Sequence, residues 1–158
     1  MALSNFSWII PGKLAGSERP GGLMGGNPGA IENDLNQLHA EGVRLVVSLE
    51  NMPSSFRKQC MEKGMEWVSF PIKDFDAPDN KTSFAAFIDA IILAVRQGKP
   101  VCVHCRAGIG RTGLVLACVL GKYLGIDSDK AIAAVRSTRT ALETEEQVAF
   151  VKDFCSSR

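Results

Sequence analysis

The chain has 158 residues, 46% of them hydrophobic, and its 18 lysine and arginine residues nearly balance its 17 aspartate and glutamate residues, for a formal net charge of +1. This length and apolar fraction suit one domain with one substantial core, so we expect residues 1–158 to form a single domain. The balanced charge argues against a broad nucleic-acid or membrane-surface footprint, which means that any anion site must be local.

The five cysteines, at 60, 102, 105, 118 and 155, lack the even number and regular spacing of a disulfide framework. No basic segment followed by a long apolar stretch opens the sequence, and no apolar run reaches transmembrane length. We therefore expect reduced thiols, a cytoplasmic location and no membrane span.

Hydrophobic periodicity divides the first hundred residues into alternating strands and helices. Short apolar runs bounded by turn residues predict strands, and apolar residues three or four apart predict helices. Glycine and proline crowd residues 20–29, which predicts a surface loop. The expected elements are, in chain order, edge strands at 8–10 and 14–15, a helix from Asn27-Pro28 to Gly42, a buried strand at 43–49, a helix at 54–63, a strand at 66–71 and a helix at 82–97.

The rest of the chain continues this alternation. The apolar run 101–104 predicts a buried strand, and an apolar helix is expected from Gly110 to Tyr123. Two further helices are expected, at 128–136 and after Thr144, where Thr144-Glu145-Glu146-Gln147 fits a capping box. The pattern predicts an α/β layer fold, with helices on both faces of a largely parallel sheet.

The junction of the strand at 101–104 with the following helix carries the strongest functional signal. Backbone N–H groups converge in such a loop, and the helix dipole adds positive potential, so the junction predicts an anion cradle. The residues expected to bind a phosphate there are Arg106, Ala107, Gly108, Ile109, Gly110 and Arg111.

Cys105 opens this loop, where the same amides and Arg111 would favour its thiolate; in such settings a thiol pKa falls from about 8.5 to roughly 3.5–7.5. We therefore expect Cys105 to be a nucleophile. The planar guanidinium of Arg111 can grip two phosphate oxygens. Gly108 and Gly110 let the loop close around the anion, and the Thr112 hydroxyl is expected near the Cys105 sulfur, where it would help the sulfur leave.

The run His104-Cys105-x5-Arg111-Thr112 resembles the signature of the protein tyrosine phosphatase superfamily, and residues 5–16 look like the opening of its small atypical dual-specificity members. The resemblance implies a cysteine-phosphatase fold, a phosphocysteine intermediate, no cofactor and no metal. It also implies a phosphorylated protein as substrate, carrying phosphotyrosine and, because a short chain leaves the pocket shallow, also phosphoserine or phosphothreonine.

The resemblance implies a general acid as well. Residues 70–78 resemble the family's acid loop, which makes Asp74 the catalytic acid and later the base, with Asp76 as the alternative. Glu143 stands before Thr144-x-x-Gln147, where tyrosine-specific members carry a glutamine. We hypothesise that Glu143 assists hydrolysis or proton transfer, with Gln147 in support.

Several residues have a plainer reading beside the functional one. We interpret His104 as a buried hydrogen-bonding residue that orients the loop, with a proton carrier as the alternative. Arg136 and Arg139 either face the rim of the site or are solvated charges at a helix end. Cys102 and Cys105 form a C-x-x-C, yet no second ligand pair is nearby, so Cys102 is expected in the core. Cys118 is expected in the core as well, and a protective disulfide between Cys105 and either Cys102 or Cys118, a pattern known in relatives, stays open.

Other functions compete with a protein phosphatase. A phosphoinositide or RNA 5′-phosphate substrate would demand more local positive charge, since Arg106 is the only basic side chain between Cys105 and Arg111. A non-catalytic phosphoprotein-binding module would be expected to lack the cysteine, the arginine or the acid. The Gly-x-Gly-Arg-Thr-Gly pattern and the Asp74 loop favour phosphatase chemistry over that of a rhodanese-like sulfur transferase or arsenate reductase. The oligomeric state is open, with a monomer as the default.

Overall fold

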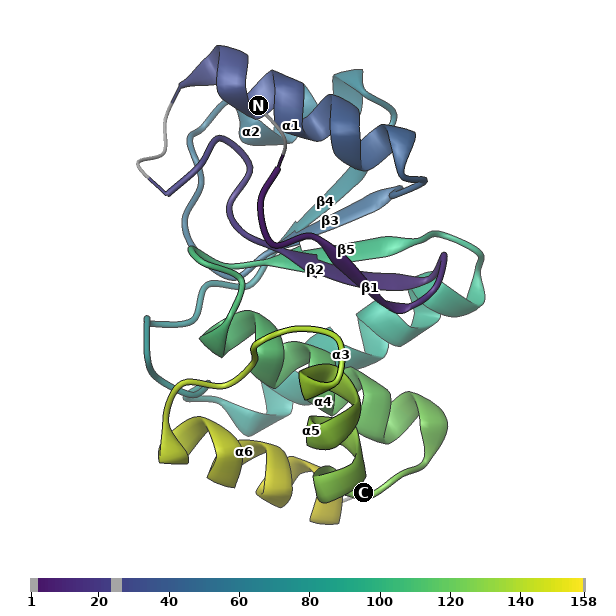
Figure 1. Ribbon diagram of the computed structural model, residues 1–158, viewed down its shortest axis with the longest axis vertical. Coiled ribbons are helices and arrows are strands. Elements are labelled where there is room, and N and C mark those ends of the chain that lie inside the picture. Colours follow the sequence, from purple (N-terminus) through teal and green to yellow (C-terminus); the bar gives the residue numbers. More distant parts are fainter. Residues whose placement is uncertain (1–2, 24–26, 158) are drawn as a thin grey trace.

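A computed structural model of the protein describes residues 3–23 and 27–157 (Figure 1). Its centre is a sheet of five strands in the order β1-β2-β5-β3-β4. Strand β1 runs antiparallel to β2, and the other neighbouring pairs are parallel. The strands are β1 (Ser7–Ile10), β2 (Leu14–Ser17), β3 (Leu45–Ser48), β4 (Glu66–Ser69) and β5 (Val101–His104).

Helices cover both faces of the sheet, as predicted. Helices α1 (Pro28–Ala40) and α2 (Phe56–Glu62) lie on one face, and α3 (Lys81–Arg96), α4 (Gly110–Leu124), α5 (Ser128–Arg136) and α6 (Glu145–Ser156) lie on the other (Figure 1). Successive strand residues point to opposite faces. Val47 and Val103 therefore pack in the core under α3–α6, whereas Val46 and Cys102 pack under α1 and α2.

Each element expected in the described part of the chain is present, but one position in the sheet was predicted wrongly. The segment at 14–15 was expected at an edge, yet β2 is fully buried and pairs with both β1 and β5. Its small and apolar residues suit an interior strand, and only β1 shields it from the edge. The strand expected to reach Pro71 ends at Ser69.

Local capping signals were also confirmed. The Asn27 side chain accepts hydrogen bonds from the amides of Gly29 and Ala30, so α1 begins inside the predicted loop at 20–29, of which residues 24–26 lie outside the described part. Thr144 and Gln147 form the expected capping box of α6. None of the helices described has the length and apolar character that crossing a membrane requires.

Candidate active site

The predicted cradle lies at the carboxyl end of β5, between β2 and β3. Cys105 follows β5 directly, and α4 begins at Gly110, so strand, loop and helix join as the sequence predicted. Cys105 is 3% exposed. In an open parallel sheet this edge is where ligands bind, because helix N-termini and loop amides gather there.

The outside of the loop is held by hydrogen bonds to its carbonyl groups. The Asn5 Nδ2 group donates to the Ala107 carbonyl at 2.9 Å, and an Arg139 terminal nitrogen donates to the Gly108 carbonyl at 2.8 Å. Because the C=O and N–H of a trans peptide point in opposite directions, the N–H groups of Gly108 and Ile109 face away from these donors. The loop therefore presents amides on its inner side, as an anion cradle requires.

Gly108 allows this tight closure. Its φ is +77°, and a Cβ at this position would lie 2.5 Å from the carbonyl oxygen of Ser17. Arg139 fixes the same region, since its other terminal nitrogen donates to the Gly16 carbonyl at 2.7 Å and to the Ser7 hydroxyl at 2.8 Å. Arg139 is buried, so of the two readings left open for it, that of a solvated charge is wrong: it supports the loop from behind.

Arg111 and Asp74 come together at the mouth of the cradle. Arg111 is 5% exposed, and one terminal nitrogen donates to the Ile72 carbonyl at 2.9 Å. The other terminal nitrogen of Arg111 lies 3.3 Å from Oδ1 of Asp74, and the buried Nε of Arg111 has no hydrogen-bond partner. A buried unpaired donor is costly, so this Nε suits an anion in the cradle. Asp76, the alternative acid, makes its contact through the backbone, because its carbonyl accepts a hydrogen bond from the Gln147 side chain.

The segment at 143–147 borders both the cradle and the acid loop. A Cβ on Gly110 would collide with the Glu143 carboxylate, which places that carboxylate against the cradle. Gln147 is fully buried; its Oε1 accepts from the Glu143 amide at 2.7 Å and its Nε2 donates to the Asp76 carbonyl at 3.4 Å. Thr144 donates through its hydroxyl to the Phe75 carbonyl at 3.4 Å.

Thr112 and His104 occupy the interior. The Thr112 hydroxyl is buried and makes no hydrogen bond, so a role toward the Cys105 sulfur stays a prediction. His104 is fully buried, with Nδ1 3.0 Å from the Cys105 carbonyl and Nε2 2.5 Å from the Ser48 hydroxyl, which accepts from Trp67. Burial lowers the pKa of His104 to about 4. A neutral ring with its proton on Nδ1 satisfies every partner and ties the loop to the sheet.

Two charged neighbours of the cradle were not identified in the sequence analysis. The guanidinium of Arg19, just after β2, forms a bidentate ion pair with Glu50, just after β3. The Glu50 carboxylate also lies 3.7 Å from Arg111. Charged residues directly after two strands of the sheet were the available signal, because carboxyl ends of parallel strands meet at one edge.

Burial disfavours the thiolate form of three of the other cysteines. It raises the pKa of Cys102 to about 11, that of Cys60 to about 12 and that of Cys118 well above its usual value. Within residues 3–23 and 27–157, no group of three or more histidine, cysteine or acidic side chains is arranged to hold a metal ion.

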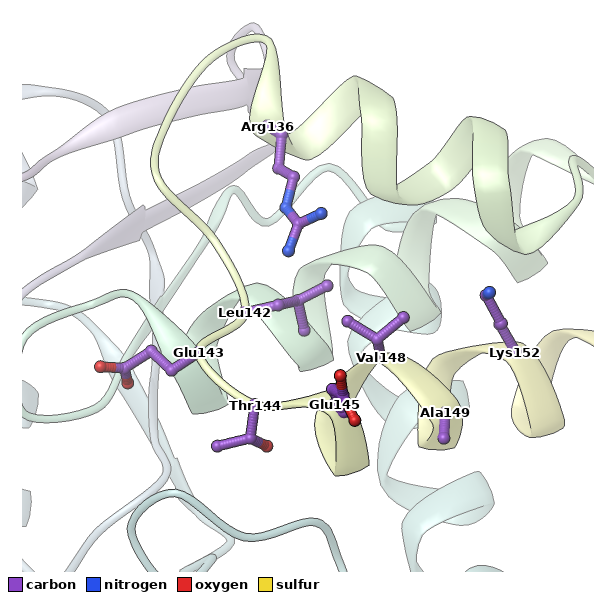
Figure 2. Close-up of a pocket in the computed structure, with 8 residues that line it drawn as sticks. All are labelled: Arg136, Leu142, Glu143, Thr144, Glu145, Val148, Ala149 and Lys152. Carbon is purple, nitrogen blue, oxygen red and sulfur yellow. The ribbon is translucent and has the colours of Figure 1, made fainter.

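A cavity of about 460 Å³ lies beside the cradle and shares Glu143 with it (Figure 2). Its lining combines the apolar side chains of Leu142 and Val148 with Arg136, whose side chain reaches toward Leu142, and with Lys152 (Figure 2). Neither Cys105 nor Arg111 lines this cavity, so it flanks the predicted reaction centre and does not contain it.

Comparison with known proteins finds relatives among the tyrosine phosphatases. A family model described as "Polymorphic toxin system, DSP-PTPase phosphatase" matches residues 17–123. Protein tyrosine phosphatase domain-containing protein 1 of Danio rerio is 30% identical over 138 residues, which are 77% of this chain and 19% of that protein. Putative tyrosine phosphatase 067L of Invertebrate iridescent virus 3 is 38% identical over 73 residues, 44% of this chain and 30% of that protein. The chain thus spans less than a third of the length of these relatives.

Solved structures share the fold over nearly the whole chain. The crystal structure of Tk-PTP in the active form superposes with a TM-score of 0.82 at 29% identity and covers 97% of both chains. The structure of PTPMT1 in complex with PI(5)P reaches 0.79 at 16% identity over 96% of this chain and 95% of that chain, a likeness that shows the fold alone.

Proposed function

Because this chain belongs to the dual-specificity-type (DSP-PTPase) family of protein tyrosine phosphatases, and is therefore a cysteine-dependent phosphatase, we propose that it dephosphorylates phosphotyrosine in proteins, and phosphoserine or phosphothreonine as well. One observation carries the assignment of residues: Arg111 and Asp74 lie 3.3 Å apart at the mouth of the loop that begins with Cys105. We take residues 1–158 as one catalytic domain, and a cytoplasmic location stays a prediction.

In the first step, the Cys105 thiolate attacks phosphorus in line with the departing oxygen. The S–P bond forms as the P–O bond breaks, and Asp74 gives its proton to the leaving alcohol or phenol. Arg111 supports this step because its planar fork can hold two equatorial oxygens, through the unpartnered Nε and a terminal nitrogen. The amides of residues 106–111 hold the remaining negative charge.

In the second step, water attacks the phosphocysteine, Asp74 takes a proton from the water, and the Cys105 thiolate leaves as inorganic phosphate forms. We assign Glu143 to assistance in this step because its carboxylate lies against Gly110 at the cradle. Gln147 is a positioning residue, since it connects the Glu143 amide with the acid loop. We assign the Thr112 hydroxyl, which is buried and has no hydrogen-bond partner, to stabilising the departing sulfur.

Within the family, a phosphoinositide or RNA 5′-phosphate is the alternative substrate. Solved PTPMT1 holds PI(5)P on this fold. The cradle here offers only one basic side chain, Arg106, between Cys105 and Arg111, which favours a phosphoprotein over a polyanionic headgroup or RNA. A binding module without turnover is disfavoured because the cysteine, the arginine and the acid are all present.

The test compares kcat/KM on phosphotyrosyl, phosphoseryl and phosphothreonyl peptides and on a phosphoinositide in detergent micelles, with EDTA present. We expect the tyrosyl peptide to turn over fastest, Asp74→Asn to lose about 100-fold or more in kcat, and Asp76→Asn, the matched control, to lose little. Preference for the phosphoinositide would overturn the substrate assignment, and a larger loss in Asp76→Asn would move the acid to that residue.

A further inference from the structure

The pairing register of the sheet places three charged residues in one row across the active-site edge. Ser17 and Ser48 both pair with His104, on the two sides of β5. Arg19, Glu50 and Arg106 lie two residues after Ser17, Ser48 and His104, respectively. Arg19 and Glu50 therefore approach the start of the cradle from opposite sides, which is why they can reach each other around it.

The contacts make Glu50 a carboxylate shared by two arginines. The Arg19 Nε donates to Oε1 of Glu50, and an Arg19 terminal nitrogen donates to Oε2 at 2.8 Å. The same Oε2 lies 3.7 Å from a terminal nitrogen of Arg111. The Arg19 amide also donates to the Arg106 carbonyl at 3.0 Å, so Arg19 is anchored to the cradle loop through its backbone as well.

A carboxylate in this position conflicts with phosphate binding. The Glu50 side chain is 9% exposed, so water screens its charge poorly. Left unpaired, it would repel a phosphate dianion and compete with it for Arg111. The Arg19 side chain is 22% exposed, and its hydrogen bond with Glu50 raises the pKa of its guanidinium although burial opposes this.

We propose that Arg19 is a positioning residue of the active site, which neutralises Glu50 by a bidentate ion pair and so keeps Arg111 available for the phosphate. The inference rests on the proposed function of Arg111 as the phosphate clamp. This role of the Arg19–Glu50 pair differs from a purely structural one, because a structural pair would change the unfolding temperature without changing the affinity for an anion.

The experiment measures kcat and KM for p-nitrophenyl phosphate and the competitive Ki of inorganic phosphate in four variants. Arg19→Ala should raise both KM and Ki about tenfold or more, as expected for one uncompensated charge near the anion. Arg19→Ala/Glu50→Gln should bring both back to within about threefold of wild type, because the competing charge has gone. Glu50→Gln alone should stay within about threefold. Lys63→Ala, which breaks the exposed Lys63–Glu32 ion pair, is the control and should leave both constants unchanged.

Two results would overturn the proposal: an unchanged phosphate Ki in Arg19→Ala, or a double variant as impaired as the single one. If Arg19→Ala does not fold, Arg19→Lys replaces it; a lysine keeps the charge but not the fork, so Ki should rise by less, and no rise contradicts the proposal. Phosphate titration into Cys105→Ser, with and without Arg19→Ala, separates this inference from the proposed function, because it measures anion affinity where turnover is absent.

Discussion

The phosphate cradle and the acid loop meet at Arg111, but they are held by different kinds of contact. The cradle is fixed by the buried side chains of Arg139 and His104, which bind its backbone carbonyls at 2.8 and 3.0 Å. Residues 74–76 of the acid loop are held by longer contacts of 3.3–3.4 Å from Arg111, Thr144 and Gln147, whereas the start of the loop is anchored by the 2.9 Å hydrogen bond from Arg111 to the Ile72 carbonyl. At its tip, Phe75 has a φ of +62° and is 56% exposed.

This difference separates two chemical tasks. Charge stabilisation needs donors that do not reorganise, which buried clamps on the backbone provide. Proton transfer needs a carboxylate that can approach a leaving group and later a water molecule, which weaker tethers permit. Changes in the cradle should therefore damage anion binding and chemistry together, whereas changes in the tethers of the acid loop should damage chemistry alone.

Gly108→Ala is expected to have the largest effect, because it attacks the cradle directly. A Cβ there meets the Ser17 carbonyl at 2.5 Å on a backbone with φ +77°, so the loop must shift. We expect kcat/KM to fall by about 100-fold or more, since small displacements of reacting groups have effects of that order.

Gly125→Ala is the matched control for this prediction. Gly125 has a φ of +66° but nothing within 4 Å of an added Cβ, so it reproduces the backbone strain without the collision. It should cost about 1 kcal/mol of stability and leave kcat/KM unchanged. Equal activity losses in both variants would show that strain alone, not the shape of the cradle, accounts for the effect.

The burial of His104, which contacts the Cys105 carbonyl of the cradle, should make the stability of the protein depend on pH. Its pKa is about 4 when folded and about 6.5 when unfolded, so the unfolded chain binds an extra proton between these values. The contribution of His104 to the free energy of unfolding should therefore be fully present above about pH 6.5. It should be lost as the pH falls toward 4, by up to about 3 kcal/mol.

Thermal or urea unfolding at several pH values measures this slope, with His104→Asn as the comparison. The variant should be less stable at pH 7 but should lose less between pH 6.5 and pH 4. Parallel curves for the two proteins would mean that His104 is not the titrating group.

Gln147→Ala should have the smallest effect, and it separates the acid loop from the cradle most directly. It removes the donor to the Asp76 carbonyl and the acceptor of the Glu143 amide. We expect kcat to fall about tenfold while the Ki of inorganic phosphate changes by less than about twofold. Gln147→Glu keeps the acceptor but not the donor, so a similar kcat in both variants would assign the effect to the acid loop. A matching rise in Ki would mean that loop and cradle do not act separately.

The local parts of this site could be predicted from sequence, and the long-range parts could not. Cys105, Arg111 and the cradle amides lie in one contiguous segment whose glycines and helix start are visible in the sequence. The acid loop came from a resemblance, and Asp74 beside Arg111 agrees with it. Arg19 and Glu50 were missed because their meeting depends on β5 lying between β2 and β3.

The wrong prediction of β2 as an edge strand has the same cause. The position of β2 inside the sheet follows from which strands pair, and residues 14–15 alone do not contain that information. The left-handed backbone of Phe75 was equally hidden, because a bulky aromatic residue rarely adopts a positive φ and gives no turn signal.

The central claim is that Cys105 carries the phosphoryl group during turnover. The most direct measurement is rapid acid quenching of the protein with p-nitrophenyl phosphate, followed by digestion and mass spectrometry of the peptide that contains residue 105. The account predicts a phosphorylated Cys105 in wild type, more of it in Asp74→Asn if hydrolysis slows more than attack, and none in Cys105→Ser. Turnover by Cys105→Ser, or a phosphoryl group on any other residue of a turning-over wild type, would contradict it.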